Sequence, residues 1–243
     1  MNNKKLFTKK YTLVVDVETA NSLEDALPYD IGFCVIDRQG VIYEEYSYVV
    51  SEIFLGFREL METAYYAEKL PNYWEDIKNK KREVASVWVI RRLVHELIKK
   101  YDIAEVAAYN MNFDLTALNN LVRFISGSAC RWFFPYGIEF QCIWHMATQT
   151  LCNTKGYITK AMSMGWQSEK GNIQTSAEVV YRFLTNNTDF EEEHTGLEDV
   201  KIEVEILQAC RRKKKKMNKG INRQCWQIPQ AKTKEYKEKM AEV

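Results

Sequence analysis

Three short stretches of the chain place carboxylates where they could act together. The first contains Asp16 and Glu18, which follow the apolar run Leu13–Val15 and flank Val17. This composition is typical of a buried strand, and side chains alternate along a strand, so both acids would project from one face about 6–7 Å apart. An isolated buried carboxylate is strongly disfavoured, and a divalent cation with oxygen ligands is a suitable partner. The stretch indicates a metal site, although an ordinary strand end running into solvent has the same pattern.

The second stretch surrounds Asp114. This residue follows a short predicted strand, Glu105–Tyr109, and begins a helix whose apolar face extends to Ile125. A carboxylate in the first turn of a helix is favoured by the positive end of the helix dipole. Stabilisation of the helix would explain Asp114 by itself, so any chemistry depends on what lies beside it.

The third stretch pairs a histidine with an aspartate at a helix start. Thr195 and Glu198 have the spacing of a capping box with Thr195 as the N-cap. His194 then precedes the cap and Asp199 is the fourth helical residue, and these two positions touch each other in a hydrophobic staple. A staple normally uses two apolar residues, whereas both residues here are titratable. The pattern predicts that His194 and Asp199 lie side by side.

The order of the predicted elements favours an α/β fold. Three strand-like runs with short connections predict an antiparallel meander, and the later strands alternate with helices, which favours parallel pairing. We expect a mixed sheet of three antiparallel strands followed by two parallel strands, flanked by helices. The expected strands cover 11–19, 31–36, 41–50, 105–109 and 137–144, and the expected helices cover 83–101, 114–125, 145–151, 175–185 and 195–207, with an irregular stretch at 152–173.

The charge distribution divides the chain unevenly. We expect residues 1–210 to form one domain, with 51–82 as a helical insertion rich in aromatic residues and 211–243 as a basic tail. The tail contains twelve Lys and Arg and three Glu, a formal charge of +9, which leaves −8 on the remainder of a chain whose net charge is +1. An acidic body with a basic tail is compatible with nucleic-acid binding, because lysines neutralise phosphates. A solvated end of the chain would have the same composition.

The overall composition, with 46% hydrophobic and 28% charged residues, is typical of a soluble globular protein. No apolar run approaches the roughly 18–20 residues of a membrane span, and the N-terminus lacks a signal-peptide core, so we expect no membrane partner. Six scattered cysteines without a Cys-x-x-Cys pair indicate reduced thiols and a cytoplasmic location. Cys142 and His145 have ligand-like spacing, which leaves a zinc site as an alternative to a buried thiol and a packed histidine.

Taken in order, the three stretches read Asp-x-Glu-Thr, Asn-x-Asn-Phe-Asp and His-x-x-x-x-Asp. This series resembles the DEDDh 3′→5′ exonucleases, a family of ribonuclease-H-like fold that includes proofreading subunits of bacterial replicases and several RNA-trimming enzymes. The resemblance covers roughly residues 10–210. The insertion at 51–82 and the basic tail depart from the replicase proofreaders, and the general form is similar to phage-encoded members.

The resemblance implies a metal site and a base. Asp16, Glu18, Asp114 and Asp199 would hold two divalent ions, Mg²⁺ or Mn²⁺, with Asp16 bridging them and Asp114 acting largely through water. His194 would be the general base that takes a proton from the attacking water. Two ions about 4 Å apart can stabilise both the attacking and the leaving oxygen of a phosphoryl displacement.

The resemblance also implies a substrate pocket and a reaction. Thr19 would contact the terminal nucleotide, and Asn110 and Phe113 would help to shape the pocket. The expected reaction releases 5′-nucleoside monophosphates from the 3′ end of single-stranded DNA. RNA or a short oligoribonucleotide is the alternative substrate, since no residue settles how the pocket treats a 2′-hydroxyl. A catalytically silent nucleic-acid-binding or scaffold protein with this fold is the other alternative.

Overall fold

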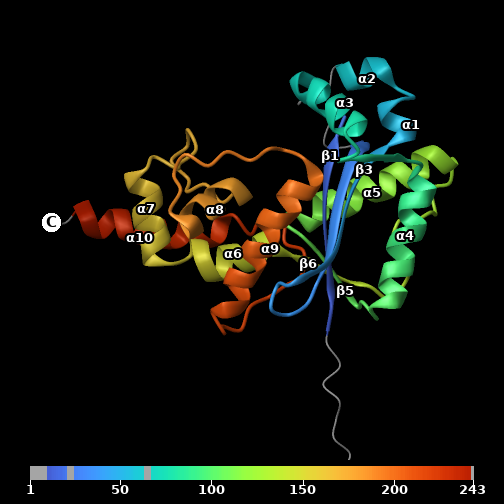
Figure 1. The fold of residues 1–243 in the computed structure, drawn as a ribbon. Coiled ribbons are helices and arrows are strands. Elements are labelled where there is room, and N and C mark those ends of the chain that lie inside the picture. The colour runs from blue at the N-terminus through green and yellow to red at the C-terminus, as the bar shows by residue number, and fades with distance from the viewer. Residues whose placement is uncertain (1–9, 21–24, 63–66, 242–243) are drawn as a thin grey trace, which may run out of the picture.

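A six-stranded sheet forms the centre of the computed structural model, which describes residues 10–20, 25–62 and 67–241, with side chains as far as Lys234 (Figure 1). The strand order is β4-β3-β2-β1-β5-β6. The strands are β1 (Thr12–Thr19), β2 (Pro28–Ile36), β3 (Ile42–Val50), β4 (Glu83–Ala85), β5 (Glu105–Ala108) and β6 (Glu139–Cys142).

The pairing confirms the expected mixed sheet. Strands β1, β2 and β3 form antiparallel ladders, and β5 and β6 continue the sheet in parallel from β1. The turn between β2 and β3 is fixed by Asp37, whose Oδ1 accepts hydrogen bonds from the N–H groups of Gln39 (2.8 Å) and Val41 (3.1 Å). Gly40 adopts φ +85° in this turn, a conformation that favours glycine.

The sixth strand, β4, was not expected, because residues 83–85 were predicted to begin a helix. They pair in parallel with the end of β3 instead. Helix α4 (Val87–Lys100) begins later because Ser86 is its N-cap and accepts a hydrogen bond from the N–H of Trp88 (3.3 Å). Glu52 also accepts from the N–H of Val87 (3.1 Å), which fixes the same boundary.

Helices cover both faces of the sheet. Figure 1 shows α4 and α5 (Met111–Ser126) on one side and α6 (Ile143–Ala147), α8 (Ala177–Thr185) and α9 (Gly196–Arg212) on the other. Leu13, Val15 and Val17 belong to the core under α4 and α5, whereas Val14 belongs to the core under α9. Because side chains alternate along β1, Asp16 and Glu18 must face the side of α9.

The segment between β3 and β4 is helical in its described parts. It contains α1 (Ser51–Phe54), α2 (Arg58–Glu62), a short 3-10 helix η1 (Ala67–Lys69) and α3 (Leu70–Lys78), which lie together near one end of the sheet in Figure 1. Phe54 and Tyr73 are buried, and their rings lie 6.0 Å apart between centroids. These two aromatic residues therefore pack inward, whereas Trp74 remains half-exposed.

The stretch after β6 contains one helix that was not expected. The helix expected at 145–151 is present as α6 followed by a π-helix, η2 (Thr148–Cys152), whereas α7 (Lys155–Ser163) lies within the stretch predicted to be irregular. Thr154 caps α7, accepting a hydrogen bond from the N–H of Tyr157 (3.3 Å). Helix α8 is capped by Ser176, because the hydroxyl of Thr175 instead accepts a hydrogen bond from the indole of Trp144 (2.8 Å).

Residues after α9 fold back along the body and end in α10 (Gln227–Ala241). The N–H of Cys142 donates to the carbonyl of Lys219 (2.7 Å), and Cys225 is fully buried. Arg223 donates to the side-chain oxygen of Asn112 (3.0 Å), beside the start of α5. Across the described ranges, we find no helix with both the length and the apolar character that a membrane crossing needs.

Candidate active site

A close contact between two glycines brings the start of α9 onto the sheet. Gly32 pairs with Asp16 in the β1–β2 ladder. A Cβ added to Gly32 would lie 2.1 Å from the carbonyl carbon of Gly196, and a Cβ on Gly196 would lie 2.5 Å from the nitrogen of Gly32. Only glycine permits this approach at either position. It places the first turn of α9 directly against the strand beside Asp16.

The candidate active site is a cavity of about 540 Å³ at the end of β1. Its lining includes seven of the eight residues singled out in the sequence, namely Asp16, Glu18, Asn110, Phe113, Asp114, His194 and Asp199. Ligand atoms of Glu18, His194 and Asp199 all lie within 4.8 Å of one another, so His194 and Asp199 are adjacent as their spacing predicts. Thr19 ends β1 after a register shift, and the part of the cavity wall that the structure describes does not include it.

Burial and mutual repulsion raise the pKa values of the carboxyl groups around this cavity. Burial is the larger cause for Glu18, whose pKa rises to about 9, with a further contribution from the charge of Asp199. Burial and the charge of Glu192 raise the pKa of Asp199 to about 8. Burial raises the pKa of Asp114 to about 7, against hydrogen bonds from backbone N–H groups including that of Val17.

Asp16 is surrounded by the other acids of the cavity. Burial raises the pKa of Asp16 well above its usual range, followed by the charges of Glu203, Asp114, Glu18 and Asp199. Like charges this close are tolerated only when they are protonated or bind a cation.

Two acids in the cavity, Glu192 and Glu203, were not singled out in the sequence. Glu203 is 2% exposed, and one of its oxygens accepts a hydrogen bond from the N–H of Tyr109 (2.9 Å). It lies four residues after Asp199 on α9, and residues at this spacing share a helix face. That spacing was the available signal. Glu203 alternates with Val204 and Glu205, however, and this pattern made it resemble an acid that faces solvent.

The donor set fits a divalent cation. Asp114 Oδ1, Asp199 Oδ1 and Glu203 Oε2 are buried oxygens without a hydrogen-bond partner among the described residues. Buried polar atoms are rarely left in this state. Carboxylate oxygens are the ligands that Mg²⁺ and Mn²⁺ prefer, and a cation would satisfy these atoms and offset their repulsion.

The loop before α9 holds His194 in an uncommon backbone conformation, with φ +50°. Its Nδ1 lies 4.0 Å from Glu192 Oε2. Burial lowers the pKa of the imidazole, and the nearby Lys69 lowers it further. His194 is therefore neutral at neutral pH and able to accept a proton.

Thr195 and Glu198 occupy the positions of the predicted capping box, but they do not make its hydrogen bonds to the backbone. Thr195 is the N-cap of α9, yet its side chain makes no capping hydrogen bond to the backbone. Its hydroxyl donates instead to Glu198 Oε2 (2.6 Å).

The alternative zinc site at Cys142 and His145 is not formed. The thiol of Cys142 donates to the carbonyl of Tyr109 (3.4 Å), and Nδ1 of His145 is hydrogen-bonded to the carbonyl of Gly220 (2.8 Å). The groups of potential metal ligands found in the described residues include neither side chain.

The fold is shared with known nucleases. The zinc-bound complex of Escherichia coli exonuclease I with single-stranded DNA aligns with a TM-score of 0.52 and 11% sequence identity over 82% of this chain. The complex of exonuclease I with a dT13 oligonucleotide aligns with a TM-score of 0.51 and 12% identity over 83% of this chain. Exonuclease X in complex with a 5′-overhanging duplex DNA aligns with a TM-score of 0.43 and 14% identity over 83% of this chain and 91% of exonuclease X.

The likeness to exonuclease I covers 40–41% of that protein's length. No family model matches the sequence, and no curated protein does. The shared architecture is the ribonuclease-H-like α/β fold that the sequence predicted.

Proposed function

We propose that this protein is a metal-dependent 3′→5′ exonuclease of the DEDDh type that acts on single-stranded DNA. One observation carries the proposal: buried carboxylates with unsatisfied oxygens and a histidine share one open cavity at the end of β1. A scaffold protein has no need of such a costly cluster. The neighbouring exonuclease I complexes with DNA support the choice of DNA over RNA.

The acids would hold the metal ions. Asp16, Glu18, Asp114 and Asp199 are the proposed ligands of two Mg²⁺ or Mn²⁺ ions, and Glu203 is buried against them. When bound, such ions supply Lewis-acid stabilisation of the charge that develops on the phosphate oxygens.

His194 is the proposed general base. Its lowered pKa favours the unprotonated imidazole, which is the form that can take the proton of the attacking water. His194 lies directly before the N-cap of α9, and Asp199 lies in the first turn of that helix, so the start of α9 positions both the proposed base and a proposed metal ligand.

The other wall of the cavity is proposed to bind the terminal nucleotide. Asn110, Phe113 and Trp144 line it, and the indole of Trp144 is fixed by its hydrogen bond to Thr175. An aromatic wall can stack on a base of any sequence, which suits an enzyme that removes nucleotides one after another. Thr19, next to Glu18, stays a predicted contact to the same nucleotide.

We further propose that residues 1–210 form the exonuclease domain, with 51–82 as a helical insertion, and that the basic segment 211–243 guides the strand toward the cavity. Arg223 belongs to that segment, and it donates a hydrogen bond to Asn112, which directly precedes the cavity residue Phe113.

The proposal is tested by digesting DNA and RNA oligonucleotides of equal sequence with Mg²⁺, Mn²⁺ or EDTA. We expect stepwise loss from the 3′ end that requires metal, faster on DNA, and abolished in Asp16→Ala. Faster digestion of RNA than of DNA would identify RNA as the substrate in place of single-stranded DNA. Bound metal without cleavage of either substrate would favour the scaffold reading.

A further inference from the structure

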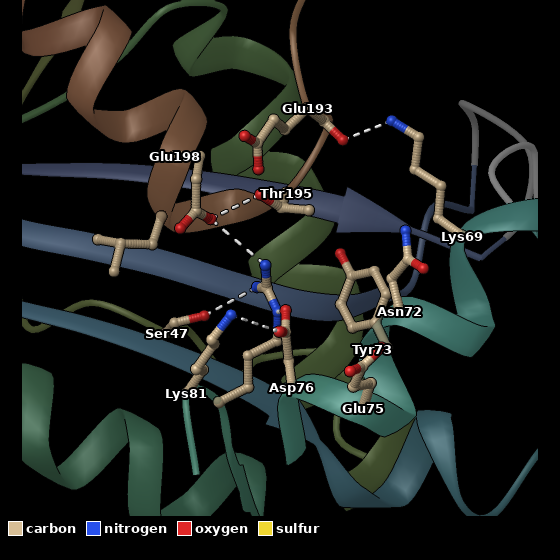
Figure 2. Close-up of a pocket in the computed structure, with 12 residues that line it drawn as sticks. Ser47, Lys69, Asn72, Tyr73, Glu75, Asp76, Lys81, Glu193, Thr195 and Glu198 are labelled. Atoms are coloured by element: carbon tan, nitrogen blue, oxygen red, sulfur yellow. Dashed lines mark hydrogen bonds and ion pairs between the residues drawn. The ribbon is translucent and has the colours of Figure 1, made fainter. Parts of the chain in front are cut away.

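A second cavity, of about 530 Å³, lies between the start of α9 and the segment 67–82 (Figure 2). Its lining includes Lys69, Tyr73 and Arg82 from that segment, and Glu193, Thr195 and Glu198 from the loop and the first turn of α9. Figure 2 shows a dashed contact from Lys69 to Glu193 across this cavity. Glu193 directly precedes His194, and Glu198, in the first turn of α9, contacts Arg82 of the same segment.

A buried carboxylate joins the two groups. Asp30, on β2, pairs with Glu18 in the β1–β2 ladder and is 0% exposed. Its Oδ2 accepts hydrogen bonds from the hydroxyl of Tyr73 (2.6 Å), from Nη1 of Arg82 (3.0 Å) and from the N–H of Gly196 (3.0 Å). One oxygen therefore ties the segment to the first residue of α9.

Arg82 extends this connection. It is 6% exposed, and its Nη1 also donates to Ser47 Oγ (2.9 Å) and its Nε to Asp76 Oδ2 (3.1 Å). Its Nη2 donates to Glu198 Oε2 (3.3 Å), the oxygen that also accepts from Thr195. A planar guanidinium with fixed donors can hold three elements in one relative geometry, which a lysine cannot do.

The backbone on the other side of His194 is also held, because Lys69 donates to the carbonyl of Glu193. His194 itself has φ +50°, a conformation that persists only where the surroundings enforce it. The hydrogen bonds of Lys69 to Glu193 and of Gly196 to Asp30 are the contacts that hold His194 in this conformation.

We propose that the Asp30–Arg82 pair, braced by Tyr73, positions His194 for proton transfer and makes the segment 67–82 part of the catalytic apparatus. These are positioning residues, since none of them lines the candidate active-site cavity. The inference rests on the proposed role of His194 as the base.

The test is a double-mutant cycle of Arg82→Met with His194→Ala, measured as kcat on a labelled DNA oligonucleotide. Misplacing the base should lower kcat on the order of 10- to 100-fold in the otherwise unchanged protein. In the His194→Ala background, Arg82→Met should lower kcat less than about threefold, because the imidazole that Arg82 positions is absent. Mn²⁺ affinity, measured by calorimetry, should change less than about threefold, since Arg82 touches none of the proposed ligands.

Arg91→Met is the matched control. Arg91 lies on α4, on the other face of the sheet from α9, and donates to the carbonyl of Trp132 (3.0 Å), so its loss should leave kcat within about threefold in either background. If Arg82→Met does not fold, judged by circular dichroism, Tyr73→Phe removes only a hydroxyl from Asp30. Its control is Tyr101→Phe, which loses a hydroxyl contact to Glu44 (2.7 Å) far from the cavity.

If Arg82→Met lowers kcat equally with His194 present and in the His194→Ala background, the pair has a general structural role and does not position His194. Wild-type kcat in Arg82→Met and Tyr73→Phe, with His194→Ala inactive, would also overturn it and leave the proposed function standing. Full activity of His194→Ala would instead overturn the proposed base.

Discussion

Removing divalent ions should make the stability of this protein strongly dependent on pH. Burial raises the pKa of Glu18 to about 9, of Asp199 to about 8 and of Asp114 to about 7. A raised pKa means that the folded state binds the proton more tightly than the unfolded state does. The stabilisation is therefore complete below the usual carboxyl range, near pH 4, and is lost as pH rises through about 7 to 9.

The size of the effect follows from these values. Each pKa unit corresponds to about 1.4 kcal/mol. Between about pH 5.5 and about pH 8.5, Asp114 alone removes about 2 kcal/mol from the free energy of unfolding. Glu18 and Asp199 add to this, but the three are not independent, and we take about 3–6 kcal/mol for the group. For a chain of this length that is a fall in Tm of roughly 5–20 °C.

The assay is thermal unfolding by circular dichroism at the two pH values, in EDTA and in excess Mn²⁺. Metal binds the deprotonated carboxylates, so the rise in Tm on adding Mn²⁺ should be larger at the higher pH. Glu18→Gln should flatten the pH dependence in EDTA, whereas Glu45→Gln, an exposed residue on β3, should not. A Tm in EDTA that stays constant or rises over this interval would refute the reasoning.

Three further predictions concern single residues. His194→Ala should lower kcat by about 10²–10⁴-fold while calorimetric Mn²⁺ binding changes little, and equal activity would contradict the base assignment. Glu203→Gln should weaken Mn²⁺ binding about 10- to 100-fold, as the loss of a residue that supports the metal ligands does. Glu205→Gln, on the exposed face of α9, should leave the affinity for Mn²⁺ unchanged. Equal affinities of the two variants would show that Glu203 only anchors the backbone. Arg223→Ala should raise KM for DNA and reduce the slope of log affinity against log salt by about 1, whereas Arg92→Ala, an exposed residue on α4, should change neither; an unchanged slope in Arg223→Ala would exclude Arg223 from the path of the strand.

The strands and most helices could be predicted because their local signals are strong. β1 contains a nearly continuous buried apolar run. α9 is preceded by a histidine and a threonine cap, and its first turn contains two acids at staple and capping-box spacing from them. The sequence did not predict the boundary at Ser86, because the helical periodicity of α4 continues backward into Glu83–Ala85. The hydrogen bonds from Trp88 to Ser86 and from Val87 to Glu52 show where the helix begins. α7 was missed because the glycines near it indicated a loop.

The candidate site could be predicted only in part, for a related reason. Asp16, Glu18 and Asp199 stand out because each lies at the end of a regular element. Glu203 does not, because it lies in the middle of a helix, and its importance comes from the contact of Gly32 with Gly196, which joins positions far apart in the chain. The role of Arg82 is a tertiary property of the same kind, since its partners come from β2, β3, α3 and α9.

The central claim is that this carboxylate cluster drives hydrolysis from a 3′ end. The most direct measurement is digestion of a 5′-labelled single-stranded DNA in Mn²⁺ by the wild type and by Asp16→Asn, with products resolved at single-nucleotide steps. The account predicts a ladder that shortens one nucleotide at a time in the wild type, is absent in EDTA and is absent in Asp16→Asn. Cleavage that starts internally or at the 5′ end, or that persists in Asp16→Asn, would contradict it.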